Sequence, residues 1–132
     1  FAWFNSLAQI PKVAWYSLQQ GKPAIQLENG ESTLPLARWI EQCDDMAETA
    51  ALIANLDLVI SVDTAVAHLT AALGKPLYLL SRFDACWRWL INGQISPWYP
   101  AAHVLRQTQP DDWESVMPLL STMVSEQAHL RR

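Results

Sequence analysis

The sequence predicts an α/β domain in which helices flank a parallel sheet. Two largely apolar runs, residues 56–62 and 77–80, are typical of strands that are covered on both faces. Segments with helical patterns alternate with these strands along the chain, as in folds built from right-handed crossovers. A length of 132 residues leaves room for one hydrophobic core. We therefore expect a single domain over residues 1–132.

The first third of the chain carries weaker patterns than the rest. Residues 1–9 fit a short amphipathic helix that ends at Pro11. Residues 13–18 are aromatic and β-branched, which favours a strand, and residues 19–23 are its exit turn. Residues 34–40 fit either a short strand or a helical turn.

The middle of the chain predicts two helices with clear ends. Asp45 and Glu48 have the spacing of a capping box, in which the first side chain accepts an early amide proton of the helix. This predicts a helix over residues 46–55. A second helix over residues 65–73 is apolar nearly all round, so it packs deep, and Gly74 ends it.

The last third contains a long connection, a strand and a helix. Residues 81–100 connect two strands and hold three of the seven tryptophans of the chain. Residues 102–106 form the last strand. Asp111 and Glu114 predict a second capping box that opens the terminal helix, in which Pro118 should cause a kink because it removes a main-chain hydrogen bond.

Composition and charge exclude several classes of function. The net charge is −4 and no cluster of Lys or Arg forms a footprint for nucleic acid. Charged residues break every apolar stretch before the roughly 18 residues of a membrane span, and the N-terminus lacks the pattern of a signal peptide. Cys43 and Cys86 have no metal-binding spacing, so free thiols are favoured over a disulfide and indicate a cytoplasmic location. We expect neither a metal nor a cofactor.

The carboxyl ends of the predicted strands are where an open α/β sheet binds ligands. Three segments lie there: residues 19–21, 61–64 and 81–84. The second segment is the most informative, because a buried strand runs almost directly into a helix. The free amides and the dipole of that helix start would suit a diphosphate.

Asp63 and His68 are the side chains that we expect at this helix start. Asp63 can cap the helix or accept hydrogen bonds from sugar hydroxyls, and His68 lies one turn along the same face as Thr64. An alternative stays open, since an Asp-Thr pair after a strand is usually a plain cap and a lone histidine is usually a core residue.

The other two segments suggest further ligand contacts. Gln19 and Gln20 could contact the edge of a base or ribose, and Arg82 or Arg88 could pair with a phosphate. Three tryptophans in the long connection, Trp87, Trp89 and Trp98, fit packing on the sheet edge, but one of their rings could also stack on a nucleobase or sugar.

The segment DLVISVDTAVAHLTAALGKP, residues 57–76, resembles the signature of glycosyltransferase family 9, the ADP-heptose:lipopolysaccharide heptosyltransferases. Further motifs resemble a subgroup in which this domain is fused behind tetratricopeptide repeats. These motifs are residues 17–21, 87–90, 96–100, Arg106-Gln107 and Asp112-Trp113. The resemblance covers nearly the whole chain.

The resemblance implies the C-terminal, Rossmann-like half of a metal-independent GT-B glycosyltransferase. In that fold this half binds a nucleoside-diphosphate sugar, so Asp63, Thr64 and Ala65 would hold the diphosphate and sugar, and His68 would support them. Heptosyltransferases tend to have glycine where Ala65 stands, and its Cβ narrows the approach of a phosphate.

The resemblance also implies that parts of the enzyme lie outside this chain. The chain begins on a helical pattern, so we expect the first strand of the domain, the N-terminal acceptor domain and the catalytic base to be absent from it. The fragment alone would then not transfer sugar. The alternative is a non-catalytic domain of the same fold that serves binding or assembly beside the repeats. Ala65 and the low glycine content of this chain favour the alternative slightly.

Overall fold

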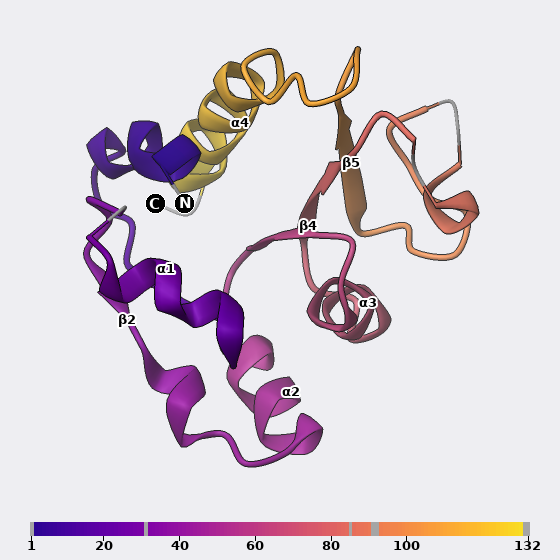
Figure 1. The fold of residues 1–132 in the computed structure, drawn as a ribbon. Coiled ribbons are helices and arrows are strands. Elements are labelled where there is room, and N and C mark those ends of the chain that lie inside the picture. Colours follow the sequence, from indigo (N-terminus) through magenta and orange to yellow (C-terminus); the bar gives the residue numbers. More distant parts are fainter. Residues whose placement is uncertain (1, 31, 85, 91–92, 131–132) are drawn as a thin grey trace. The chain divides into compact units, whose positions relative to one another are not determined.

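The computed structural model of the chain describes residues 2–30, 32–84, 86–90 and 93–130 (Figure 1). The chain forms two compact units, one made of Phe1–Asp44 and Met117–Arg132 and the other of Asp45–Val116. Both contain parallel strands and helices, which confirms the predicted α/β class with its Rossmann-like arrangement. The assignment of one domain to the whole chain stays a prediction.

The first unit contains a two-stranded parallel sheet. Strand β1 (Trp15–Tyr16) pairs with β2 (Leu36–Ala37), and the 3-10 helix η1 (Ala2–Gln9) precedes them. The predicted strand at residues 13–18 is thus reduced to two paired residues. The segment 34–40, for which strand and helical turn were both open, contains both, because β2 is followed by the 3-10 helix η3 (Trp39–Gln42).

A helical segment occupies the region where only an exit turn was expected. The 3-10 helix η2 (Lys22–Ala24) continues directly into α1 (Ile25–Glu28). Gly21 precedes it with φ of 67°, a left-handed conformation that glycine adopts without steric cost. Pro23 lies in the first turn of this segment, where its missing amide proton costs nothing.

The second unit contains a three-stranded parallel sheet with the order β3-β4-β5. Its strands are β3 (Val59–Val62), β4 (Leu77–Ser81) and β5 (Ala102–Arg106), close to the predicted ranges. All five residues of β4, the central strand, are buried. This agrees with the continuous apolar run that predicted a strand covered on both faces.

Two helices accompany this sheet. Helix α2 (Met46–Ala54) contacts α3 (Ala65–Ala72), and α3 in turn contacts β3 and β4. The predicted cap at Asp45 is confirmed, because its Oδ1 accepts a hydrogen bond from the Glu48 amide at 2.8 Å. Gly74 follows α3 with φ of 69°, as expected for a residue that ends a helix.

The terminal helix α4 (Val116–Leu130) begins later than predicted, and a different aspartate precedes it. Asp112, not Asp111, accepts the hydrogen bond from the Ser115 amide, at 3.1 Å. Asp111 instead adopts a left-handed conformation with φ of 60°. The predicted capping box was therefore wrong by one residue.

The expected kink at Pro118 loses its physical basis for the same reason. Since α4 starts at Val116, Pro118 lies in the first turn, where amide groups have no partner within the helix. The proline therefore removes no main-chain hydrogen bond of the helix. In the described part of the chain, no helix combines the length and the apolar character needed to cross a membrane.

Candidate functional site

The carboxyl ends of the three long strands lie at one edge of the sheet in the second unit. The parallel register pairs Val62 with Leu80 and Ser81 with Arg106. The chain leaves β3 at Val62 and enters α3 only two residues later, through Asp63 and Thr64. This short junction, at the carboxyl end of β3, is the candidate site.

The first turn of α3 is open rather than capped. Thr64 precedes the helix with extended backbone angles (φ −141°, ψ 169°), but its side chain caps no amide. Its Oγ1 lies instead 3.1 Å from the Ser61 Oγ. Asp63, Thr64 and Ala65 are all exposed. The start of the helix at Thr64 and Ala65 therefore lies at the surface, although Ala67 is buried at 0% exposure, and the helix dipole would favour a negative ligand there.

Ala65 is compatible with this geometry. It is the first residue of α3, and it is absent from the residues with positive φ in the described chain. The backbone therefore does not require the glycine that is common at this position in heptosyltransferases. Compared with glycine, Ala65 adds a Cβ at the start of α3, and this atom narrows the approach of a phosphate.

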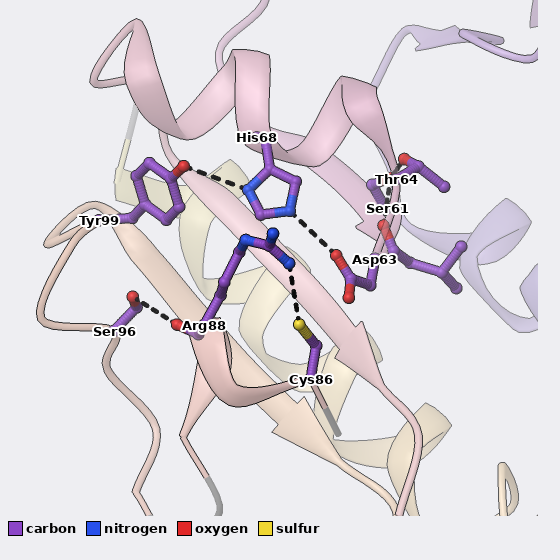
Figure 2. A network of polar contacts seen from close by, with 9 residues as sticks. Ser61, Asp63, Thr64, His68, Cys86, Arg88, Ser96 and Tyr99 are labelled. Carbon is purple, nitrogen blue, oxygen red and sulfur yellow. Dashed lines mark hydrogen bonds and ion pairs between the residues drawn. The ribbon is translucent and has the colours of Figure 1, made fainter. Parts of the chain in front are cut away.

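His68 joins the junction to the loop before β5. Its Nε2 lies 3.1 Å from the Asp63 Oδ1, and its Nδ1 lies 3.2 Å from the Tyr99 hydroxyl (Figure 2). The side chains of His68 and Asp63 are 28% and 39% exposed, so neither is sealed in the core. The interpretation of His68 as an ordinary core residue thus fits poorly.

The ring of His68 is also held by stacking. It packs nearly parallel to the indole of Trp89, with centroids 5.0 Å apart and an interplanar angle of 25°. Tyr99 contacts both rings, at 5.6 Å from His68 and 5.5 Å from Trp89. Trp89 is buried, at 1% exposure. Its packing role, which the sequence favoured for most of the tryptophans, is therefore confirmed for this residue.

Arg106 fixes the turn that carries Trp89, the 3-10 helix η4 (Trp87–Trp89). Its Nη1 donates to the Ser81 Oγ at 3.1 Å, and its Nη2 donates to the main-chain oxygens of Trp89 and Leu90. Burial lowers the pKa of Arg106. The guanidinium nevertheless keeps its charge near neutral pH, so these bonds are charge-assisted.

The two arginines proposed for a phosphate differ in their partners. Arg82 donates to the Asp84 carboxylate at 3.0 Å, and both side chains are mostly exposed. Arg88 donates to the Cys86 Sγ at 3.1 Å, and among the described residues no carboxylate pairs with it. Its side chain extends from the loop in the direction of His68 and Asp63 (Figure 2).

Gln19 and Gln20 belong to the first unit. The Gln20 side-chain amide donates to the main-chain oxygens of Ile40 and Cys43, at 3.1 and 3.2 Å. The Gln19 Oε1 is buried and has no hydrogen-bond partner. Both cysteines are free thiols, as expected, but they are only partly buried.

Three residues of the site were missed by the analysis of the sequence. Tyr99, Trp89 and Arg106 contact or support His68, although they lie 21 to 38 positions further along the chain. Nothing in local spacing links them to His68. The available signal was the concentration of aromatic residues in a loop that leaves the carboxyl end of a strand.

Comparisons with known proteins cover the segment that contains this junction. Residues 44–81 match the family model of glycosyltransferase family 9 (heptosyltransferase), a segment that contains β3, the junction and His68. Over 130 residues the chain is 26% identical to Protein FlbA of Caulobacter vibrioides, a match that covers 96% of this chain and 22% of FlbA. The chain thus spans about a fifth of the length of that curated relative. No solved structure gives a significant match. These similarities support a domain like those of glycosyltransferase family 9.

Proposed function

We propose that this chain forms the donor-binding part of a metal-independent GT-B glycosyltransferase, which transfers a sugar from a nucleoside-diphosphate donor. The observation that carries the proposal is the open start of α3 beside the Asp63–His68 pair. The family match covers this same segment. The exposure of the junction leaves a ligand room to approach it.

The diphosphate would lie at the first turn of α3. The amides of Ala65, Val66 and Ala67 lie in that turn, and the Thr64 side chain does not occupy them. Unpaired amides together with the helix dipole bind phosphate groups at many helix starts. In a transfer reaction the same groups would stabilise the negative charge of the departing diphosphate.

Asp63 would accept hydrogen bonds from hydroxyl groups of the sugar. His68 binds its Oδ1, so the carboxylate is held in one orientation while its other oxygen stays available for such a bond. His68 itself is held by Tyr99 and Trp89. A rigidly placed acceptor contributes to catalysis by orienting the bound sugar.

Arg88 is the better candidate of the two arginines for a phosphate contact. The charge of Arg82 is already balanced by Asp84, whereas Arg88 has no carboxylate partner among the described residues. A guanidinium can bind phosphate through two parallel hydrogen bonds. Gln19 and Gln20 are proposed only as secondary contacts to the base or ribose, since the Gln20 amide is already engaged.

The remaining parts of the enzyme would lie in the longer protein. We propose that an acceptor domain with the catalytic base, and tetratricopeptide repeats, precede this segment in a cytoplasmic protein. The acceptor and the donor would then meet only when both domains are present. This chain alone should bind donor without transferring sugar.

The test measures the binding of UDP, ADP and GDP to the chain by calorimetry or NMR. EDTA is present to remove metal ions, because the proposed binding needs none. One of these nucleotides should bind, and Asp63→Ala or His68→Ala should weaken that binding at least tenfold. Glu114→Ala, which removes an exposed carboxylate of the same unit, should have no effect. If none of the three binds at millimolar concentration, the non-catalytic alternative becomes the better account.

A further inference from the structure

Two tryptophans beside the candidate site are exposed although they contact each other. Trp87 is 63% exposed and Trp98 is 52% exposed. Their ring centroids lie 5.3 Å apart at an interplanar angle of 85°, an edge-to-face pair. The sequence favoured packing on the sheet edge for these residues, but only Trp89 of the three is buried.

Buried polar groups hold this pair in position. Ser96 is 1% exposed, and its Oγ donates to the Arg88 main-chain oxygen at 3.1 Å while it accepts from the Trp98 amide at 3.3 Å (Figure 2). One hydroxyl therefore ties the turn that carries Trp98 to the turn that carries Trp87. Arg106 also binds the turn that carries Trp87, because it donates to the Trp89 main-chain oxygen. The indoles are thus presented on a rigid support.

A positive charge accompanies the two rings. The Arg88 Cζ lies 4.9 Å from the ring centroid of Trp87, and in the described part of the chain it meets no carboxylate. Arg88 covers one face of Trp87, and the edge-to-face contact covers one further indole face of the pair. The indole faces that remain beside this unneutralised cation suit a flat ring that is attached to an anion. Such a ligand would satisfy the apolar and the charged parts of the surface together.

The same turn connects this surface to the donor corner. Trp89, two positions after Trp87, stacks on His68, and His68 pairs with Asp63. A nucleoside diphosphate combines an aromatic ring and a diphosphate in one molecule. We infer that Trp87, Trp98 and Arg88 form the base-stacking subsite of the nucleotide whose diphosphate binds at α3. This inference rests on the proposed function.

A nucleobase fits this surface better than a sugar ring does. Stacking on indoles requires only a π face, which every base offers whatever its edge groups. Sugar hydroxyls need polar partners, and the exposed carboxylate of Asp63 supplies these at the other end of the site. The subsite should therefore raise the affinity for nucleotides with any base, and it should add little selectivity between bases.

The experiment is a set of NMR titrations of the chain with UDP, ADP, GDP, inorganic pyrophosphate and methyl α-glucopyranoside. The indole N–H signals of Trp87 and Trp98 should both shift with the nucleotide that binds. Pyrophosphate can bind Arg88 over the Trp87 ring, so with it only the Trp98 signal must stay in place, and the glucoside should shift neither signal. Trp87→Ala and Trp98→Ala should each weaken that nucleotide about 5- to 150-fold while the affinity for pyrophosphate changes less than about twofold. Trp87→Phe should retain most of the affinity. Trp3→Ala, which removes an exposed indole of the first unit, is the matched control.

Three results would overturn the inference, and they differ in what else they affect. If nucleotide binding is lost in Asp63→Ala but unchanged in both tryptophan variants, the subsite is wrong and the donor corner stands. If the glucoside shifts the indole signals instead of a nucleotide, the surface binds sugar. If no nucleotide binds the unaltered chain, the proposed function fails and takes this inference with it.

Discussion

The proton arrangement around His68 follows from its two neighbours. An ionised Asp63 can only accept, so a neutral His68 must carry its proton on Nε2. The Nδ1 then has a lone pair, and the Tyr99 hydroxyl must donate to it. Tyr99 is thus a positioning residue that holds the imidazole toward Asp63. The stacked Trp89 supplies the matching apolar contact.

We predict that Tyr99→Phe changes the Nδ1 of His68 and leaves its Nε2 nearly unchanged. The substitution keeps the ring contact but removes the hydrogen-bond donor. The ¹⁵N signal of Nδ1 should therefore move toward that of an unbonded ring nitrogen, as measured in long-range ¹H–¹⁵N spectra. Tyr16→Phe, in the first unit, is the control. An unchanged Nδ1 signal would show that the Tyr99 hydroxyl does not bind His68.

Asp112 is the residue for which the structure predicts a pH effect. Hydrogen bonds from Thr108 and Ser115 lower the pKa of its carboxyl group. A lowered pKa means that the folded state favours the ionised form. The stabilisation is then complete above the ordinary aspartate pKa of about 3.9, and it is lost as the pH falls from there through the lowered value.

We predict that Thr108→Val raises the pKa of Asp112, because the substitution removes the first of these donors. A ¹³C titration of the carboxyl group should show the midpoint moving up toward its ordinary value. Thr122→Val, whose hydroxyl binds only a main-chain oxygen of its own helix, should leave the midpoint in place. A midpoint unchanged by Thr108→Val would assign the effect to the Ser115 bonds alone.

Local chemistry was enough to predict the residues of the junction but not the contacts that hold them. Asp63 and His68 lie on consecutive turns, so spacing alone placed them together. Tyr99 and Trp89 contact His68 from the long connection between β4 and β5, far from it in sequence. The path of a long loop depends on anchors such as Arg106 and Ser96, which no periodic pattern marks.

At the scale of elements, the position of Pro118 gives a direct test of where α4 begins. A proline in the first turn replaces an amide that has no partner within the helix. We predict that Pro118→Ala changes the free energy of unfolding by less than about 1 kcal/mol. Glu126→Pro, an exposed site further inside α4, should lower it by about 3 kcal/mol or more. Urea denaturation followed by circular dichroism measures both, and a large gain in stability in Pro118→Ala would place the helix start earlier, because the proline would then be an interior one.

The elements that the sequence predicted well are those with a clear apolar pattern and clear ends. Strand β5 has the predicted ends, and α2 and α3 each differ by one residue at one end, because apolar periodicity and caps define them. The two-residue strands β1 and β2 and the short helix α1 are too short for any period to appear. Strands β1 and β2 pair with each other across about 20 residues of sequence, so they depend on the tertiary fold.

At the scale of the whole molecule, the division into two units predicts where a bound nucleotide changes local stability. A ligand raises the opening free energy of the groups it contacts and of the cooperative unit they belong to. The groups proposed for the diphosphate and the sugar, and the two stacking tryptophans, belong to Asp45–Val116, while the secondary contacts Gln19 and Gln20 belong to the other unit. With the bound nucleotide near saturation, we predict slower amide exchange at the start of α3 and in η4.

Amide hydrogen exchange followed by mass spectrometry would compare the two units in one sample. The peptide that contains Gln19 and Gln20 is the informative reference, since the Gln20 amide group is already bound to Ile40 and Cys43. Slower exchange there as well would bring these two glutamines into the site. Unchanged exchange at α3, under conditions where a nucleotide binds, would contradict the diphosphate assignment. The helix-start amides would then be satisfied by solvent alone, and Asp63 and His68 would form a hydrogen-bonded surface pair without a ligand.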